Sequence, residues 1–359
     1  FWANTIQSLI AFSLIASLYI LYNLNIFVVF CGSILASFLV YCFSNLIGKP
    51  SFKHGVPFVV FLRTSIGLNG ARYFGIVRGL VGIFFFGVQT YFISKSLGYL
   101  IRISMFSFDS SLLENDYLFL FFMGLNPIDW LSLLITLFFQ YYLFSKGHKF
   151  IKSFINFSGL FVYFGIIFFL IILFSEYSQQ IQEKFLEIFQ FENMFTKNNV
   201  APLITITGTM FAYFSIVILN FGDFSRYAKS EKELNKGNLS LLLNMLIFSF
   251  LAIFITIGSD IVINKNLTEA ERFLTNPTDI IGKINNTYIT VTCLMFILIA
   301  SLSSNLIANY IPTQNALINF LPSKLGLKSS GLIIILVGLV VGALWLSLIS
   351  QLGILSFVD

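Results

Sequence analysis

Polar side chains interrupt an apolar run between Ile299 and Asn315, which reads IASLSSNLIANYIPTQN, and their spacing fits a binding site. Ala300, Ser303 and Ser304 stand at positions i, i+3 and i+4, which places one carbonyl and two hydroxyls along one side of a helix. Polar groups in hydrocarbon cost free energy unless they find partners, so such a cluster lines a ligand or ion site or joins helices. The alternative is that the serines bond back to their own helix.

A hard monovalent cation takes hydroxyl oxygens and carbonyls released by a broken helix, and one helix does not supply enough of them. The N-terminal sequence WANTIQ (2–7) is the candidate partner because it is polar and non-periodic inside an apolar run. Asn309 lies about 140° from Ser304 on an ideal helical wheel. We therefore expect Asn309 to face away from the serines.

An aromatic ring and an amide occur four residues apart in FFFGVQTYF (84–92), at Phe85 and Gln89, and so share one helix face. A ring that stacks and an amide that donates and accepts suit a flat heterocycle with hydrogen-bonding edges. Ordinary packing is the alternative, because the chain has 45 Phe.

Motifs of common enzymes are absent from the sequence. The two histidines, His54 and His148, lie beside lysines in polar segments, and no HExxH, paired CxxC, P-loop or Gly-x-Ser-x-Gly motif occurs. A membrane enzyme would need a buried acid–base or metal cluster, and a channel would need a polar stripe along several helices. We expect neither.

The composition is that of an integral membrane protein. Apolar residues make up 57% of the chain, charged residues only 10%, and mean hydropathy is +0.88. A soluble domain carries about 25% charged residues. The chain begins at Phe1 and stops in apolar sequence at Asp359, which we interpret as a fragment.

The apolar runs predict nine transmembrane helices, each about 20 residues long. They are 3–22, 25–47, 73–100, 128–145, 151–175, 202–221, 239–263, 280–310 and 331–351. Residues 112–125 are too short and acidic to span and are expected to be interfacial or re-entrant. Residues 57–67 and 313–321 are expected along the membrane surface, and 176–201 and 264–279 as loops.

The distribution of basic residues predicts the orientation in the membrane. With the N-terminus in the cytoplasm, inside segments hold fourteen Lys and Arg and outside segments hold six. This asymmetry follows the positive-inside rule. The net charge of +5 is therefore explained by topology, and no nucleic-acid partner is expected.

Three motifs in order resemble the nucleobase–cation symporter-1 family of hydantoin, allantoin, uracil and cytosine permeases. They are GVPFVVFLRTSIGLNGARYFGIVRGLVGIFFFGVQTYF (55–92), NFGDFSRYAKS (220–230) and SSNLIANYIPTQN (303–315). The resemblance implies one all-α transmembrane domain with a LeuT-like inverted-repeat bundle. The first repeat would cover about 1–175, and the second, incomplete, about 202–359.

The same resemblance implies the site residues. Those implied for the substrate are Phe85, Gln89, Ala212, Tyr213, Asn309 and Gln7. Those implied for sodium are the carbonyls of Ala3, Ile6 and Ala300 and the hydroxyls of Ser303 and Ser304. Phe85 and Tyr213 stand where the family usually has Trp, which implies a smaller stacking sandwich and a different or smaller heterocycle.

The implied function is secondary active import of a planar nitrogen heterocycle by a monomeric carrier in the cell membrane, with no resident cofactor. The retained hydroxyls favour co-transported sodium, and a proton is the other possibility. A transport-inactive sensor or scaffold on the same fold is the alternative from another class.

Overall fold

A computed structural model describes residues 1–20, 26–188, 197–264, 281, 286–345 and 347 of the chain. Within those ranges the regular structure is helical, apart from one isolated bridge between Phe122 and Leu125. The prediction of an all-α protein is confirmed. The chain forms two compact units, a first unit of 1–58 and 159–285 and a second unit of 59–158 and 286–359. Each unit draws on both halves of the chain, and the division into repeats stays a prediction.

Eight helices in the described residues are long and apolar enough to cross a membrane. Their spans are Phe27–His54, Arg63–Phe108, Pro127–Phe144, Lys149–Ser175, Val200–Leu219, Glu231–Thr256, Thr287–Phe320 and Leu327–Leu344. Large apolar side chains are exposed on them, Phe138 to 73% and Leu160 to 64% for example, as suits a lipid-facing surface.

The first predicted span, 3–22, is instead two helices, α1 (Trp2–Ile6) and α2 (Leu9–Ile20). The chain breaks at Gln7 and Ser8, where α1 ends and the Ser8 Oγ accepts a hydrogen bond from the Ala11 N–H at 3.0 Å. Serine at this position satisfies one of the N–H groups that the start of a helix leaves without a partner. Polarity in WANTIQS therefore produces a helix break within an apolar run.

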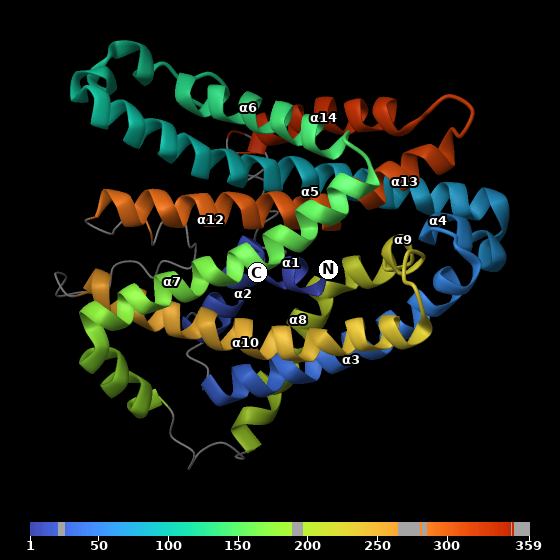
Figure 1. Cartoon of the computed structure of the whole chain (residues 1–359), viewed down its shortest axis with the longest axis horizontal. Coiled ribbons are helices and arrows are strands. Elements are labelled where there is room, and N and C mark those ends of the chain that lie inside the picture. Colours follow the sequence, from blue (N-terminus) through green and yellow to red (C-terminus); the bar gives the residue numbers. More distant parts are fainter. Residues whose placement is uncertain (21–25, 189–196, 265–280, 282–285, 346, 348–359) are drawn as a thin grey trace. The chain divides into compact units, whose positions relative to one another are not determined.

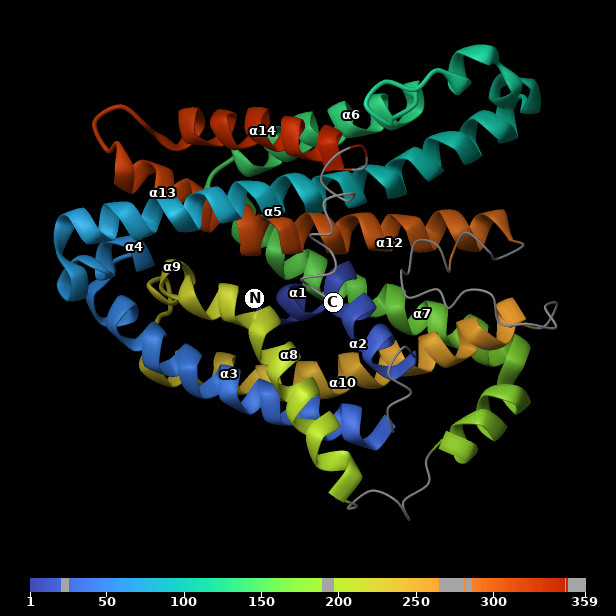
Figure 2. The same ribbon diagram turned by 180° about the vertical axis from the view of Figure 1, so that it is seen from behind.

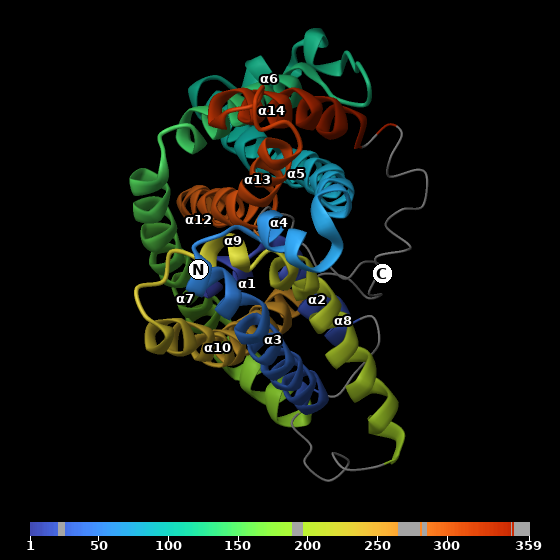
Figure 3. The same ribbon diagram turned by 90° about the vertical axis from the view of Figure 1, so that its right-hand side faces the viewer.

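The first unit is built around α3 (Ile26–His54), which packs against α8 (Val200–Leu219), α9 (Gly222–Ser225) and α10 (Glu231–Asn264) (Figures 1 and 3). It also holds α1, α2, the later part of α7 (His148–Ile188) and the short η4 (Lys197–Asn199). A Cβ at Gly32 of α3 would lie 2.6 Å from Ile206 Cγ2 of α8. A larger residue there would force these two helices apart.

Trp2 anchors the short helix α1 in the first unit. Its Nε1 donates to Asn238 Oδ1 at 3.0 Å, and its ring stacks on Phe221 with centroids 5.3 Å apart. Asn238 in turn donates to Asn45 Oδ1 at 2.9 Å, which extends the connection from α10 to α3. A five-residue helix is too short to be stable alone, so these contacts hold it in place.

The second unit is built around α5 (Arg63–Phe108), which packs against α6 (Pro127–Phe144), α12 (Thr287–Asn305), α13 (Ile311–Phe320) and α14 (Leu327–Leu344) (Figure 2). The short α4 (Phe58–Phe61) precedes it, and Gly67 near its start has a φ of 70° that other residues rarely adopt. Close packing of α5 and α14 depends on small residues, because a Cβ at Gly87 would lie 2.6 Å from Val341 Cβ.

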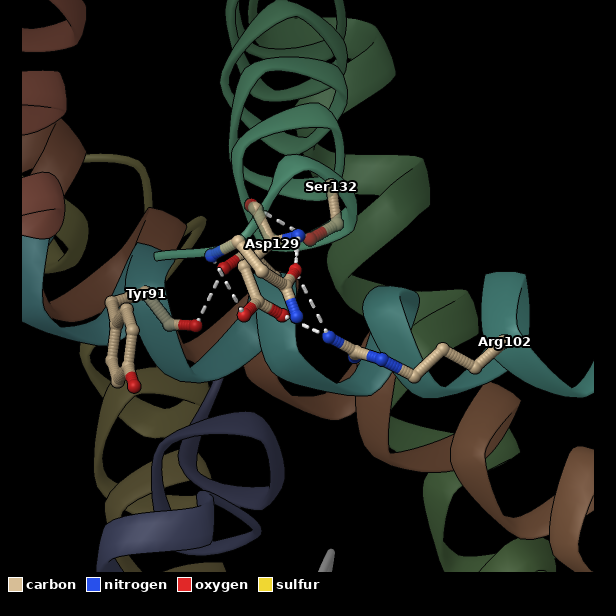
Figure 4. Close-up of polar contacts among 6 residues, drawn as sticks. Tyr91, Arg102, Asp129 and Ser132 are labelled. Carbon is tan, nitrogen blue, oxygen red and sulfur yellow. Dashed lines mark hydrogen bonds and ion pairs between the residues drawn. The ribbon is translucent and has the colours of Figure 1, made fainter. Parts of the chain in front are cut away.

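Residues 112–125, expected to be interfacial or re-entrant, form the short helices η1 (Ser110–Glu114) and η2 (Asp116–Phe119) followed by the bridged turn. An ion pair closes the connection between α5 and α6. Arg102 Nη2 lies 2.7 Å from Asp129 Oδ1, in the first turn of α6 (Figure 4). Asp129 also forms a capping box with Asn126.

Several predicted boundaries are wrong. Residues 176–188, expected in a loop, continue α7, because EYSQQIQEKFLEI is rich in good helix formers. Residues 313–321 belong largely to α13, which follows α12 and η5 without a loop, and their expected position along the membrane surface stays a prediction. Most of the expected loop 264–279 and the end of the expected span 331–351 lie outside the described residues.

Candidate functional site

The C-terminal end of α12 changes from an α-helix to a π-helix, η5, over Leu306–Tyr310. The sequence supplies a reason. Pro312 has no N–H, so it cannot donate to the Ala308 carbonyl four residues earlier. The guanidinium of the buried Arg78, on α5, donates to that carbonyl instead, with its Nη2 3.0 Å away. Single π-helical turns of this kind are frequent at functional sites.

The π-turn brings Ser304 and Asn309 toward one partner. Gln89 on α5 donates through Nε2 to Ser304 Oγ at 2.6 Å and accepts through Oε1 from Asn309 Nδ2 at 2.9 Å. The expectation that Asn309 faces away from the serines is therefore wrong. It assumed an ideal α-helix, whereas π-helical bonds join residues i and i+5 and so bring residues five apart closer to one face.

Asn305 extends this arrangement into a buried hydrogen-bond network between α5 and α12. Its Oδ1 accepts from Asn309 Nδ2 at 2.9 Å, and its Nδ2 donates to the Phe86 carbonyl at 3.3 Å and to Thr90 Oγ1 at 3.1 Å. The network continues to α6, because the Thr90 hydroxyl lies 3.0 Å from Gln140 Oε1. The amide side chains of Gln89, Asn305 and Asn309 belong to residues that are at most 5% exposed. Buried amides that satisfy one another hold a fixed geometry.

The serines of the predicted cation site bond back to their own helix. Ser303 Oγ donates to the Ala300 carbonyl at 2.9 Å, and Ser304 Oγ donates to the Ser301 carbonyl at 3.1 Å. The alternative expectation, that these serines bond back to their own helix, is therefore confirmed for both hydroxyls. It does not exclude ion binding, because a hydroxyl oxygen that donates its hydrogen keeps its lone pairs for other partners.

Phe85, the predicted stacking ring, lies on α5 one turn before Gln89 and is partly exposed within the chain. Its ring meets that of Phe84 edge to face, with centroids 5.5 Å apart. Phe86, by contrast, is fully buried and packs near Tyr310 of the π-turn, with centroids 6.0 Å apart. Phe84 and Phe85 thus both keep part of their surface uncovered, whereas Phe86 does not.

The remaining predicted residues belong to the first unit. Ala3, Ile6 and Gln7 lie on α1 and at its end, where the Gln7 N–H donates to the Ala3 carbonyl at 3.0 Å. Ile6 and Gln7 are buried, with at most 3% of each exposed. The Ala3 carbonyl thus keeps a regular helical hydrogen bond, and its role as a cation ligand stays a prediction, as does that of the Ile6 carbonyl beside the break between α1 and α2.

Tyr213 lies midway along α8 and is tied to the same helix break, since its hydroxyl pairs with Ser8 Oγ at 2.5 Å. Ala212, the preceding residue, is exposed. Ser8 was not predicted as a functional residue, although the end of the polar sequence WANTIQS could have indicated it. Figure 2 shows α1, α2 and α8 of this unit.

The structure therefore brings the predicted residues together in two sets, one in each unit. Gln89, Asn309 and Ser304 share direct hydrogen bonds in the second unit, and Tyr213 reaches the helix break in the first. The sequence reading missed a group of buried polar residues that support the second set. They are Arg78, Thr90, Gln140 and Asn305. Arg78 and Asn305 were visible as polar residues in apolar runs, but their partners were not.

Comparison with known proteins gives a consistent result. A family model described as permease for cytosine/purines, uracil, thiamine, allantoin matches residues 1–359. The chain is 24% identical over 284 residues to the purine-uracil permease NCS1 of Arabidopsis thaliana, covering 77% of this chain and 43% of that protein. It is 25% identical over 348 residues to the allantoin permease of Bacillus subtilis (strain 168), covering 94% of this chain and 66% of that protein. The chain thus spans less than two thirds of the length of either relative.

The fold resembles that of Mhp1, a nucleobase-cation-symport-1 family transporter solved in a closed conformation with bromovinylhydantoin bound. The TM-score is 0.70 at 15% identity, covering 96% of this chain and 70% of Mhp1. The inward-facing conformation of Mhp1 gives a TM-score of 0.64 at 15% identity, covering 98% of this chain and 72% of that one. These likenesses confirm the predicted LeuT-like fold.

Proposed function

Because the chain belongs to the family of permeases for cytosine/purines, uracil, thiamine and allantoin, we propose that it imports a planar nitrogen heterocycle together with a cation. A nucleobase, hydantoin or allantoin is the substrate class. The observation that carries the proposal is the buried amide pair of Gln89 and Asn309, joined at 2.9 Å within apolar helices. Uncharged donors and acceptors held in an apolar environment suit a neutral, flat, polar-edged solute.

In this proposal Phe85 and Tyr213 stack on the faces of the heterocycle, and Gln89 and Asn309 bond its edge. Ala212 and Gln7 complete the substrate-binding set. Phe and Tyr rings keep the stacking face that an indole would offer but have less area. The substrate is accordingly a compact heterocycle without a large ring substituent.

The cation is proposed to bind the carbonyls of Ala3, Ile6 and Ala300 together with the hydroxyls of Ser303 and Ser304. Support comes from the hydrogen bonds of Ser304, whose Oγ donates to one carbonyl and accepts from Gln89, which leaves a lone pair for an ion. Carbonyl and hydroxyl oxygens are the ligands of sodium in transporters with broken helices. Proton coupling is the alternative.

The hydrogen bond between Gln89 and Ser304 gives the coupling a physical basis. An ion that ligates Ser304 Oγ holds this hydroxyl in place, and the hydroxyl orients the amide that contacts the substrate. Cation binding also helps organise the broken first helix, and alternating access then carries both solutes across. By linkage, the heterocycle tightens cation binding by the same factor as the cation tightens heterocycle binding.

The protein is a multi-pass membrane protein of a transporter family. We place it in the cell membrane as a monomer with a cytoplasmic N-terminus. The excess of Lys and Arg in the segments assigned to the inside supports this orientation.

Uptake of labelled uracil, allantoin and hydantoin into proteoliposomes that contain the full-length protein, with and without a sodium gradient, tests the proposal. We expect accumulation of at least one of them, driven by sodium. Binding without accumulation would favour a sensor or scaffold. Sodium-independent uptake that Ser303→Ala plus Ser304→Ala leaves unchanged would contradict sodium coupling.

A further inference from the structure

The hydrogen bonds around Gln89 and Asn309 run outward from the NH2 group of Asn309, to Asn305 on one side and to Gln89 on the other, and the amide of Asn305 fixes this orientation. We propose that Asn305 is a positioning residue that makes the site selective for a heterocycle edge with an N–H next to a carbonyl. This inference rests on the proposed function, because it assumes that the amides of Gln89 and Asn309 contact the substrate.

The first step is the contact of Asn305 with the main chain. Its amide lies 3.3 Å from the Phe86 carbonyl, and a carbonyl can only accept a hydrogen bond. The NH2 group of Asn305 must therefore point to Phe86. Its other hydrogen is donated to the Thr90 hydroxyl, 3.1 Å away. The opposite end of the amide, Oδ1, is left to face Asn309 at 2.9 Å.

The second step carries this direction to the substrate-binding pair. Because Asn305 Oδ1 can only accept, Asn309 must turn its NH2 group toward Asn305. The same NH2 lies 2.9 Å from Gln89, which must then present its own oxygen, Oε1. The NH2 of Gln89 consequently points to Ser304 Oγ at 2.6 Å. One main-chain carbonyl thus orients three side-chain amides, none of which can turn over alone.

These hydrogen bonds determine which groups of Gln89 and Asn309 remain for a ligand. Asn309 donates both hydrogens of Nδ2, one to Gln89 and one to Asn305, so only its Oδ1 is left for a ligand. No described residue of the second unit donates to this oxygen, which can accept a hydrogen bond from the ligand. Gln89 Nε2 uses one hydrogen on Ser304 and retains the other as a donor. The site therefore offers one acceptor and one donor.

A ligand edge that matches them has an N–H for Asn309 Oδ1 and a carbonyl for Gln89 Nε2. Cyclic amides, imides and ureides carry these groups on adjacent ring atoms. Methylation of the ring nitrogens removes the donor and leaves Asn309 Oδ1 without a partner. A buried acceptor without a partner lowers affinity about tenfold or more.

The experiment compares uracil and hydantoin with their 1,3-dimethyl forms, using binding to the purified full-length protein in detergent. The quantity measured is the ratio of the two dissociation constants. Three variants are compared with wild type. Asn305→Leu removes the oxygen that orients Asn309, Asn305→Asp retains one in either protonation state, and Thr90→Val removes a hydroxyl but leaves the Phe86 carbonyl in place.

We expect wild type to prefer the unmethylated ring by about tenfold or more, because of the unpaired acceptor. In Asn305→Leu, Asn309 can turn its amide over, so the preference falls to about threefold or less. Asn305→Asp and Thr90→Val retain the wild-type ratio even where affinity for both ligands falls. A purely structural role for Asn305 would weaken both ligands equally and leave the ratio unchanged.

Two results would overturn the inference by itself, provided wild type binds uracil or hydantoin. One is an unchanged ratio in Asn305→Leu. The other is loss of the preference for the unmethylated ring in Asn305→Asp. This second result decides the question if Asn305→Leu does not fold. Failure of wild type to bind any heterocycle would instead contradict the proposed function and this role with it.

Discussion

The two units hold their candidate binding residues in different ways. In the second unit, side-chain amides and hydroxyls on long helices bond one another, as Gln89 does with Ser304 and Asn309. In the first unit, two of the candidate groups are main-chain carbonyls, those of Ala3 and Ile6, which lie just before the break between α1 and α2. Trp2 anchors α1, and Ser8 caps the start of α2. Side-chain networks define hydrogen-bonding direction, whereas a helix break exposes carbonyls that any residue type can supply.

We therefore expect substrate selectivity to depend on the side-chain amides of the second unit, and cation affinity to depend on the helix break together with the serines of α12. Substitutions at the amides of Gln89, Asn305 and Asn309 in the second unit are expected to change which ligands bind. Substitutions that disturb the helix break in the first unit are expected to change stability and cation affinity.

The largest effect is expected from Gln89→Leu. The change removes the acceptor for Asn309 and the donor for Ser304, and it removes the proposed substrate donor. Each lost or unsatisfied bond costs roughly 1–3 kcal/mol, so ligand affinity should fall about a hundredfold or more. Ligand-induced thermal shifts with uracil, allantoin and hydantoin measure it, because a ligand that binds only the folded state raises apparent stability.

Gln140→Leu is the matched control for that variant. Gln140 is also a buried glutamine of the second unit, but among the described residues it reaches the network only through Thr90. It should lower stability and keep the ligand preference. Equal losses of ligand affinity in the two variants would show that the network acts only as packing.

Ser303→Ala and Ser304→Ala should differ from each other. Ser303 bonds only to its own helix among the described residues, so its loss should raise the half-saturating sodium concentration about tenfold and leave sodium-free ligand affinity unchanged. Ser304 also accepts from Gln89, so its loss should weaken both. Sodium and ligand titrations of each variant measure this, and identical behaviour would contradict the division of roles.

Arg78→Leu should lower the free energy of unfolding by about 2 kcal/mol, because the Ala308 carbonyl of the π-turn loses its charged donor. Pro312→Ala restores a main-chain N–H that can bond to that carbonyl. The double variant Arg78→Leu with Pro312→Ala should therefore recover part of the loss. Thermal melts of the three variants form a double-mutant cycle, and strictly additive effects would argue against our explanation of the π-turn.

The smallest effect is expected from Ser8→Ala in the first unit. It removes the cap on the Ala11 N–H and the partner of the Tyr213 hydroxyl. A lost cap costs about 1 kcal/mol. The melting temperature should fall slightly while the preference among heterocycles stays that of wild type. Tyr213→Phe is the control, since it removes the same hydroxyl pair but leaves the cap, and a change in ligand preference in Ser8→Ala alone would contradict the expectation.

The sequence predicted the helical membrane fold because apolar runs of sufficient length have few other structures available. It did not predict the extension of α7 over 176–188, because polarity was taken to mean loop although the residues favour helix. The break at Gln7 and Ser8 was indicated by the polar sequence WANTIQS, but not its position.

Within the candidate site, the residue types were visible and their geometry was not. An ideal helical wheel separated Asn309 from Ser304, and only the π-turn and the side chain of Gln89 join them. Pro312, to which we attribute the π-turn, is part of the motif at 303–315. Its effect depends on Arg78, which is 234 positions earlier in the chain, and such long-range partners cannot be identified from local pattern.

Reciprocal titration tests whether one site couples the binding of a planar heterocycle to that of sodium. Heterocycle affinity is measured on the full-length protein at zero and saturating sodium, and sodium affinity at zero and saturating heterocycle. Our account predicts that each solute tightens the other by the same factor, and that Gln89→Leu reduces this factor. Heterocycle binding that is independent of sodium and unaffected by Gln89→Leu would contradict it.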